Sequence, residues 1–133
     1  YSRPLTLILF DLDHFKRIND EYGHLAGDYV LKRLSDLIHK NNIRKEECFA
    51  RYGGEEFAIL LPDTTAERGV ILAEKIRKMI DATTFEFEDN VIPVSISMGV
   101  ASLKAHETPE ALIQDADMKL YEAKQTGRNR VCA

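Results

Sequence analysis

Cysteine is scarce in this sequence of 133 residues, and its placement argues against two classes of protein. Neither of the two cysteines, Cys48 and Cys132, belongs to a Cys-x-x-Cys or mixed Cys/His spacing. A disulfide framework and a zinc site are therefore not expected. Long apolar runs and a signal peptide are missing too, since no stretch approaches the roughly 20 apolar residues that cross a bilayer. We expect a domain that works in the reducing cytoplasm.

An excess of positive charge is also lacking, because the net charge is −4. The surface as a whole is not built to attract nucleic acid, and an anionic substrate has to be held locally by a metal ion or a few placed cations. Hydrophobic residues make up 44% of the chain, enough for a core, and there is no repeat, low-complexity segment or linker. Residues 1–133 are predicted to form one domain, excised from a larger regulated protein that has room for a membrane anchor.

Strand and helix patterns alternate along the chain. The apolar run at 5–10 predicts a strand buried on both faces. Two β-rich runs, 48–52 and 57–61, flank Gly53-Gly54, which predicts a hairpin with a two-residue turn. Further strands are expected at 85–88, 92–100 and 130–132, and helices at 15–22, after Gly27-Asp28 through Ile38, at 66–83, and from Thr108-Pro109 to Gly127. The order predicts an α/β fold with a mixed central β-sheet flanked by helices.

Acidic residues gather where predicted strands end. Asp11 and Asp13 end the first strand, and Glu55-Glu56 follows the glycine pair. Carboxylates on rigid strand ends suit Mg²⁺, which takes one or two carboxylates plus substrate phosphates. Glycines without side chains allow a nucleotide to approach the backbone closely. For any one of these acids alone, a solvated hairpin tip or an ordinary strand end remains the alternative.

Five segments, in the right order, resemble the motifs of one known family. Residues 51–57, RYGGEEF, resemble the signature of GGDEF domains in its Glu-for-Asp form. The segments 11–20, 22–28, 95–100 and 116–129 match the family patterns DxDxFKxxND, FGHxxGD with Tyr for Phe, the S-I-G-V type strand, and ADxxLYxAKxxGRN. The resemblance runs from about Thr6 to Val131. It implies a fold related to the palm of nucleotidyl cyclases and polymerases.

The resemblance also implies an activity, which is the joining of two GTP molecules into cyclic di-GMP with release of pyrophosphate. The 3′-hydroxyl of one GTP would attack the α-phosphate of the other. Mg²⁺, with Mn²⁺ as the alternative ion, would be held by Asp11, the Leu12 carbonyl and Glu55, with Glu56 assisting. The catalytic residues implied are Glu55, Arg51, Lys16 and Glu56.

Substrate contacts are implied as well. Asn19 and Asp28 would read guanine, since a carboxylate accepts from N1–H and the 2-amino group, and a buried unpaired Asp28 would penalise adenine. The triphosphate would be bound by side chains of Lys16, Lys124 and Arg128, and by backbone N–H groups of His14 and Phe15 at a helix N-terminus.

The family's inhibitory product site is an Arg-x-x-Asp motif five residues before the first glycine. Here the segment reads Arg44-Lys45-Glu46-Glu47, with Glu in place of Asp. Arg44 can contact a guanine edge, so Arg44, Glu47 and Lys75 are candidates for a weakened product site. A charged loop before a strand is the equal alternative.

Three functional hypotheses follow. The first is an active cyclase that works as a homodimer, because each domain would bind one GTP and two half-sites must face each other. The second is a degenerate module that senses GTP or cyclic di-GMP without turnover. The third is a cyclase for a different or mixed nucleotide. The first is favoured by the intact residues Asp11, Lys16, Arg51, Glu55, Glu56 and Asp28.

Overall fold

A five-stranded mixed sheet forms the centre of the computed structural model, which describes residues 3–41, 44 and 47–133. The strand order is β2-β3-β1-β6-β7, and all neighbours are antiparallel except β6 and β7. The strands are β1 (Leu5–Leu12), β2 (Cys48–Tyr52), β3 (Glu56–Pro62), β6 (Ile96–Ser102) and β7 (Val131–Cys132). The predicted mixed sheet is confirmed.

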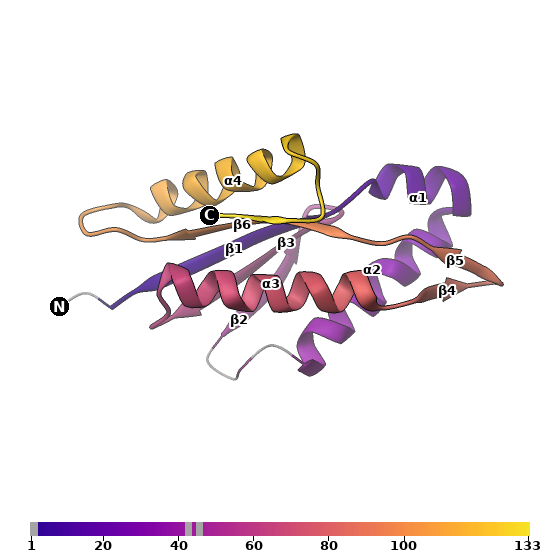
Figure 1. Cartoon of the computed structure of the whole chain (residues 1–133), viewed down its shortest axis with the longest axis horizontal. Coiled ribbons are helices and arrows are strands. Elements are labelled where there is room, and N and C mark those ends of the chain that lie inside the picture. The colour runs from indigo at the N-terminus through magenta and orange to yellow at the C-terminus, as the bar shows by residue number, and fades with distance from the viewer. Residues whose placement is uncertain (1–2, 42–43, 45–46) are drawn as a thin grey trace.

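Helices cover both faces of this sheet. Helix α4 lies on one face, and α2 and α3 lie on the other (Figure 1). A separate two-stranded hairpin, β4 and β5, lies at the same end as α1 (Figure 1). The bounds are α1 (Phe15–Tyr22), α2 (His24–Asn41), α3 (Ala66–Ala82), β4 (Phe85–Phe87), β5 (Asn90–Ile92) and α4 (Pro109–Gln125). Within the described residues, none of these helices has the length and apolarity needed to cross a membrane.

Strand β1 is the middle strand, and its side chains alternate between two separate cores. Leu7 and Leu9 pack with residues of α4, whereas Ile8 and Phe10 pack with α2 and α3. Successive side chains of a strand point to opposite faces, so Asp11 follows Leu7 and Leu9 toward α4. The alternation of the strand therefore decides that the Asp11 carboxylate lies on the side of α4.

The predicted helix start at Thr108 is confirmed. The Thr108 hydroxyl accepts a hydrogen bond of 3.2 Å from the Ala111 N–H, and Pro109 occupies the first turn. Such a cap satisfies one of the backbone donors that every helix leaves open at its start. It fixes the beginning of the helix whose other end carries Lys124.

Three boundaries differ from the predictions. Helix α2 begins at His24, so Gly27-Asp28 lies inside the helix rather than before it. The hairpin turn has three residues, because Tyr52 pairs with Glu56 and leaves Gly53–Glu55 unpaired. The run predicted as one strand at 92–100 is broken after β5 and resumes at Ile96. Pro93 lies in the break, where its missing N–H cannot serve a ladder.

Candidate active site

The end of β1 brings the predicted metal ligands together. Asp11 lies opposite Glu56 of β3 and opposite Ser97 of β6 in the ladder. The carbonyl of Glu55 accepts a hydrogen bond of 3.3 Å from the Leu12 N–H, which ties the glycine turn to the end of β1. The acids predicted at the end of the first strand and in the hairpin therefore lie together, at the C-terminal end of β1 in the middle of the sheet.

Asp11 is a buried carboxylate with one oxygen left over. It is 5% exposed, and its Oδ2 forms an ion pair with Lys124 of α4. Its Oδ1 is buried and has no hydrogen-bond partner among the described residues. A buried acceptor without a partner is costly and uncommon. The free oxygen therefore suits a bound cation.

The surroundings of Asp11 oppose its charge. Burial raises the pKa of Asp11; the Lys124 ammonium lowers it in part, and the carboxylates of Glu55 and Asp117 raise it further. Desolvation likewise raises the pKa of Glu56, and the charges of Asp11 and Glu55 add to that shift. Crowded carboxylates with raised pKa values are typical of sites that receive a cation.

A cavity of about 200 Å³ opens beside this carboxylate. Most of the predicted metal and triphosphate residues line it, and Asp13 lines it too. The lining residues are Asp11, Leu12, Asp13, His14, Phe15, Lys16, Glu55, Lys124 and Arg128. The structure thus places residues from β1, α1, the glycine turn and α4 around one space.

The N-terminus of α1 faces this cavity. His14 precedes the helix with a left-handed φ of 55°, and no side chain caps the helix start in the part of the chain described. The first N–H groups of a helix have no partner within it. The backbone of His14 and Phe15 can therefore donate to an anion in the cavity, as predicted for the triphosphate.

Glu56 lines an adjoining cavity of about 340 Å³ on the α4 side of the sheet. Asp11 and Lys124 line both cavities, but Leu12 and Glu55 line only the smaller one. Glu56 is exposed at the start of β3. The structure therefore separates the two glutamates of the signature onto different sides of Asp11.

Asn19 and Asp28, the predicted guanine readers, lie on α1 and α2 where these helices meet. A Cβ on Gly27 would come within 1.9 Å of the Asn19 Oδ1, so glycine at this position leaves room for the Asn19 side chain against α2. Asp28 follows Gly27 directly and is exposed. Asp28 is therefore open to solvent in the free domain, and its burial under a bound base stays a prediction.

Of the predicted cations, Arg51 lies away from this space, whereas Lys16 lines it with an exposed side chain. The Arg51 Nε donates a hydrogen bond of 2.8 Å to the Gly54 carbonyl, so its side chain folds over the glycine turn. Lys16 has a side chain that is 93% exposed and lies 4.0 Å from the Asp20 carboxylate. Arg51 does not line the cavity, and an approach to a phosphate would require it to leave the turn.

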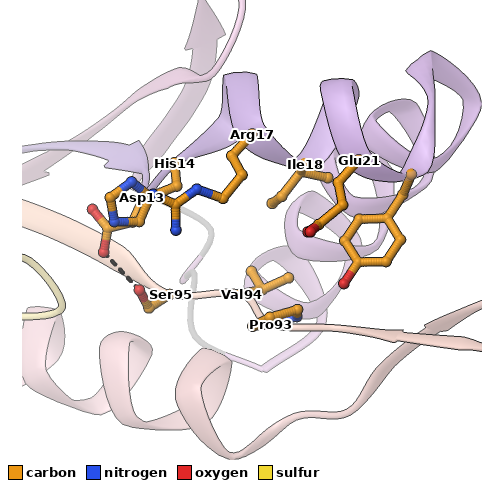
Figure 2. A pocket seen from close by; sticks show the side chains of 9 residues that line it. Asp13, His14, Arg17, Ile18, Glu21, Pro93, Val94 and Ser95 are labelled. Atoms are coloured by element: carbon orange, nitrogen blue, oxygen red, sulfur yellow. Dashed lines mark hydrogen bonds between the residues drawn. The ribbon is translucent and has the colours of Figure 1, made fainter.

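Asp13, which sequence alone groups with the metal-binding acids, is fully engaged within the protein. Its two oxygens accept hydrogen bonds from the hydroxyls of Ser95 and Ser97 and from the Asn129 N–H, at 2.6–3.0 Å. Figure 2 shows the bond to Ser95 beside a small cavity of about 130 Å³ behind α1. Asp13 therefore holds the structure rather than a metal.

The predicted product-site residues are only partly brought together. Glu47 accepts a 2.8 Å hydrogen bond from the Arg44 backbone N–H, and its carboxylate lies 3.6 Å from the Arg44 guanidinium. Arg44 and Lys75 line a cavity of about 320 Å³ together with Arg68, which sequence reasoning missed. Glu47 does not line it, and Lys45 and Glu46 lie outside the described residues.

Comparison with known proteins places the chain in a family. The profile of the family described as "Diguanylate cyclase, GGDEF domain" matches residues 1–130. The chain belongs to the GGDEF domain family. The predicted family and fold are thereby confirmed, while the roles of individual residues stay predictions.

Individual relatives agree with this membership. The diguanylate cyclase DgcP of Pseudomonas aeruginosa is 44% identical over 127 residues, which is 96% of this chain and 19% of DgcP. The structure of the active GGEEF domain of a Vibrio cholerae diguanylate cyclase is 40% identical, with a TM-score of 0.89 over 98% of this chain and 82% of that one.

The GGDEF domain of DgcB from Caulobacter crescentus, solved in complex with c-di-GMP, is 33% identical with a TM-score of 0.93, over 98% of this chain and 77% of that one. The chain spans about a fifth to a third of the length of the curated relatives it matches, for example 19%, 35% and 29% of three of them.

Proposed function

We propose that this GGDEF domain is one half-site of a diguanylate cyclase that joins two GTP molecules into cyclic di-GMP. The observation that carries the proposal is the unpaired, buried Oδ1 of Asp11 beside Glu55, in a cavity that also receives the N-terminus of α1. A carboxylate oxygen kept free of protein partners next to helix N–H groups suits a cation and a phosphate at the same place.

The family implies a divalent cation, and the residues present fit one. Mg²⁺ or Mn²⁺ would be held by Asp11, the Leu12 carbonyl and Glu55, with phosphate oxygens completing the set. Among the described residues, no group of three or more His, Cys, Asp or Glu side chains is placed to hold a metal ion. When bound, such an ion supplies charge stabilisation at the transferring phosphate and lowers the pKa of the attacking hydroxyl.

The chain's own groups orient the triphosphate. Lys124 and Arg128 present positive charge to the cavity, and the first N–H groups of α1 can donate to phosphate oxygens. Lys124 is held by Asp11 in the free domain. A cation bound by Asp11 would compete for that carboxylate and would leave the Lys124 ammonium available to phosphate. Lys16, exposed at the rim, can fold in to the same anion.

The base is read at the α1–α2 junction. Asp28 can accept from N1–H and the 2-amino group of guanine, and the Asn19 amide can both donate and accept. A base covering Asp28 would desolvate its carboxylate, and adenine would leave that carboxylate without donors. A competition experiment that compares the affinities of the domain for GTP and ATP tests this assignment, and we expect GTP to bind more tightly.

Catalysis requires two copies of the domain. One bound GTP supplies the 3′-hydroxyl and the other supplies the α-phosphate, so two half-sites face each other in a homodimer. We propose that a sensory or regulatory domain of the parent protein controls this dimerisation. Product binding belongs to the cavity of Arg44, Arg68 and Lys75, where three cations suit the guanine edges and phosphates of cyclic di-GMP.

The test uses the domain fused to a dimerising coiled coil and supplied with GTP and Mg²⁺. Glu55→Gln removes one carboxylate charge without changing side-chain size, and we expect it to abolish cyclic di-GMP formation while thermal unfolding is unchanged. Glu86→Gln on β4, an exposed glutamate outside the site, is the matched control and keeps the wild-type rate.

Wild-type turnover by Glu55→Gln would remove Glu55 from the mechanism. A wild-type dimer that binds GTP without forming cyclic di-GMP would instead make the domain a binding module.

A further inference from the structure

Asp13 and Asn129 join two parts of the site that lie 116 residues apart in sequence. The Asn129 backbone N–H donates a 3.0 Å hydrogen bond to Asp13 Oδ2. Asp13 lies between Leu12 and His14, and Asn129 directly follows Arg128. This hydrogen bond therefore ties the backbone beside Arg128 to the start of α1, while the Arg128 guanidinium donates to the Lys124 carbonyl at 3.5 Å.

The carboxylate of Asp13 is itself held from both sides. Ser97 donates to Oδ1 at 2.6 Å and Ser95 donates to Oδ2 at 2.7 Å, and the Asp13 N–H donates to the Ser95 carbonyl at 2.9 Å. Figure 2 shows Asp13 and Ser95 facing each other. Because Asp13 is 5% exposed and both its oxygens are used, it has little freedom to move.

The turn that carries Arg128 is conformationally unusual. Arg128 and Asn129 adopt left-handed φ values of 63° and 46° in succession, after Gly127 at 130°. Two successive non-glycine residues in this region are uncommon, and tertiary contacts have to maintain them. Asn129 makes such contacts, through its backbone N–H to Asp13 and through its side chain to Arg77 and Asp81.

Helix α3 supplies the remaining contacts. The Arg77 Nη1 donates to the Asn129 Oδ1 at 2.9 Å, and the Asn129 side-chain amide donates to Asp81 Oδ1 at 3.1 Å. Arg77 is also held by Glu74 at 2.9 Å, and its side chain is only 16% exposed. Arg77 does not line the active-site cavity. It can act on a ligand there only through Asn129.

We propose that Asp13, Asn129 and Arg77 are positioning residues for the triphosphate. They hold Arg128 and the N–H groups of α1 at one spacing. The inference rests on the proposed GTP site. It adds a contribution from α3, a helix that does not contact the substrate. Because these contacts concern only the phosphate end of the site, their loss weakens binding of the triphosphate and leaves the guanine end unchanged. A purely structural role predicts loss of stability with equal effects on both ends.

The experiment measures binding of GTP with Mg²⁺, and of guanosine, to the isolated domain by calorimetry. Arg77→Met removes the bond to Asn129, and Lys78→Met is the matched control because it removes the same charge from the next, exposed position of α3. We expect GTP affinity to fall by about tenfold in Arg77→Met, the usual scale for a residue that orients a ligand contact. Guanosine affinity stays unchanged, and Lys78→Met equals the wild type.

Two further variants separate positioning from folding. Asn129→Gly keeps the left-handed backbone accessible but deletes the side-chain bonds to Arg77 and Asp81, and it is expected to reproduce the loss of GTP affinity. Arg77→Lys, which keeps a donor for Asn129, is expected to restore most of that affinity.

Equal GTP binding by the wild type, Arg77→Met and Asn129→Gly would overturn the inference, and so would parallel losses for GTP and guanosine. A wild-type domain that binds no GTP would instead overturn the proposed function.

Discussion

Asp11 lies near the end of β1 and Asp13 directly follows the strand, and the two are equally buried, at 5% exposure each. Their surroundings are nevertheless of opposite kinds. Every oxygen of Asp13 accepts a hydrogen bond from the protein. Asp11 has an ion pair on one oxygen and no partner among the described residues on the other. Burial alone does not distinguish a structural acid from a ligand-binding one. The hydrogen-bond partners of each carboxylate do distinguish the two. A buried acceptor without a partner lowers the stability of the fold, and a bound ligand can offset that loss.

The largest effect that separates the two aspartates is on turnover. Asp11→Asn removes the charge that a cation needs, and we expect the rate of cyclic di-GMP formation by a dimerised domain to fall by roughly two to three orders of magnitude. Asp13→Asn is the matched change two residues away. It keeps most contacts, because a serine hydroxyl can rotate to accept from the new amide, and its loss is smaller. Equal losses in the two variants would contradict the comparison.

The next effect is on stability, and it has the opposite order. Asp13→Ala leaves the donors of Ser95, Ser97 and Asn129 without an acceptor, and we expect the free energy of unfolding to fall by roughly 2–4 kcal/mol. Urea unfolding of the metal-free domain measures it, with Asp11→Ala beside it. If Asp11→Ala proves the more destabilising of the two, the assignment of Asp13 as the structural acid is wrong.

The smallest effect concerns the cost of keeping Asp11 ready for a cation. Without divalent metal, Asp11→Asn is expected to raise the free energy of unfolding at neutral pH, by an amount on the order of 1 kcal/mol. Burial raises the pKa of Asp11, so ionising it costs more in the folded than in the unfolded chain. Lys124 is 32% exposed and stays hydrated when its partner becomes neutral.

This gain has a defined dependence on pH. A raised pKa in the folded state means that the wild type loses stability as pH rises through that pKa, and regains it as pH falls and Asp11 takes up a proton. The advantage of Asp11→Asn, measured by thermal unfolding in EDTA, should therefore shrink toward acid pH. An advantage that grows as the pH falls would contradict the sign.

Local patterns in the sequence predicted much of the fold. The apolar run of β1, the Thr108 cap and the α3 stripe depend on neighbours within a few residues, and all three are confirmed. One boundary that was wrong, the start of α2, involves a contact with another element. Helix α2 extends back to His24 across Gly27, a glycine needed for the approach of Asn19 from α1, and no pattern in the sequence of α2 announces that contact.

The ordered motifs predicted which residues belong to the candidate site. They did not predict the hydrogen bonds among those residues. The motifs located Asp11, Glu55 and Lys124, and the structure brings them around one cavity. The acid pattern alone grouped Asp13 with Asp11, whereas the family resemblance assigned the metal to Asp11 and not to Asp13. Neither predicted the partners of Asp13, which are Ser95, Ser97 and Asn129 and lie 82 to 116 residues further along the chain. The motifs also did not show that Arg51 would fold back onto the Gly54 carbonyl.

Strand β7 has a consequence for the order in which the domain is made. It is only two residues long and pairs in parallel with Met98 and Gly99 of β6. Lys124, Arg128 and Asn129 come shortly before it, so they leave the ribosome after every other described part of the site. Domains fold largely as units during synthesis, and here the sheet edge and the phosphate end of the site are completed together, in the final step. The proposed triphosphate end of the site is therefore completed only after the segment that carries β7 has been synthesised.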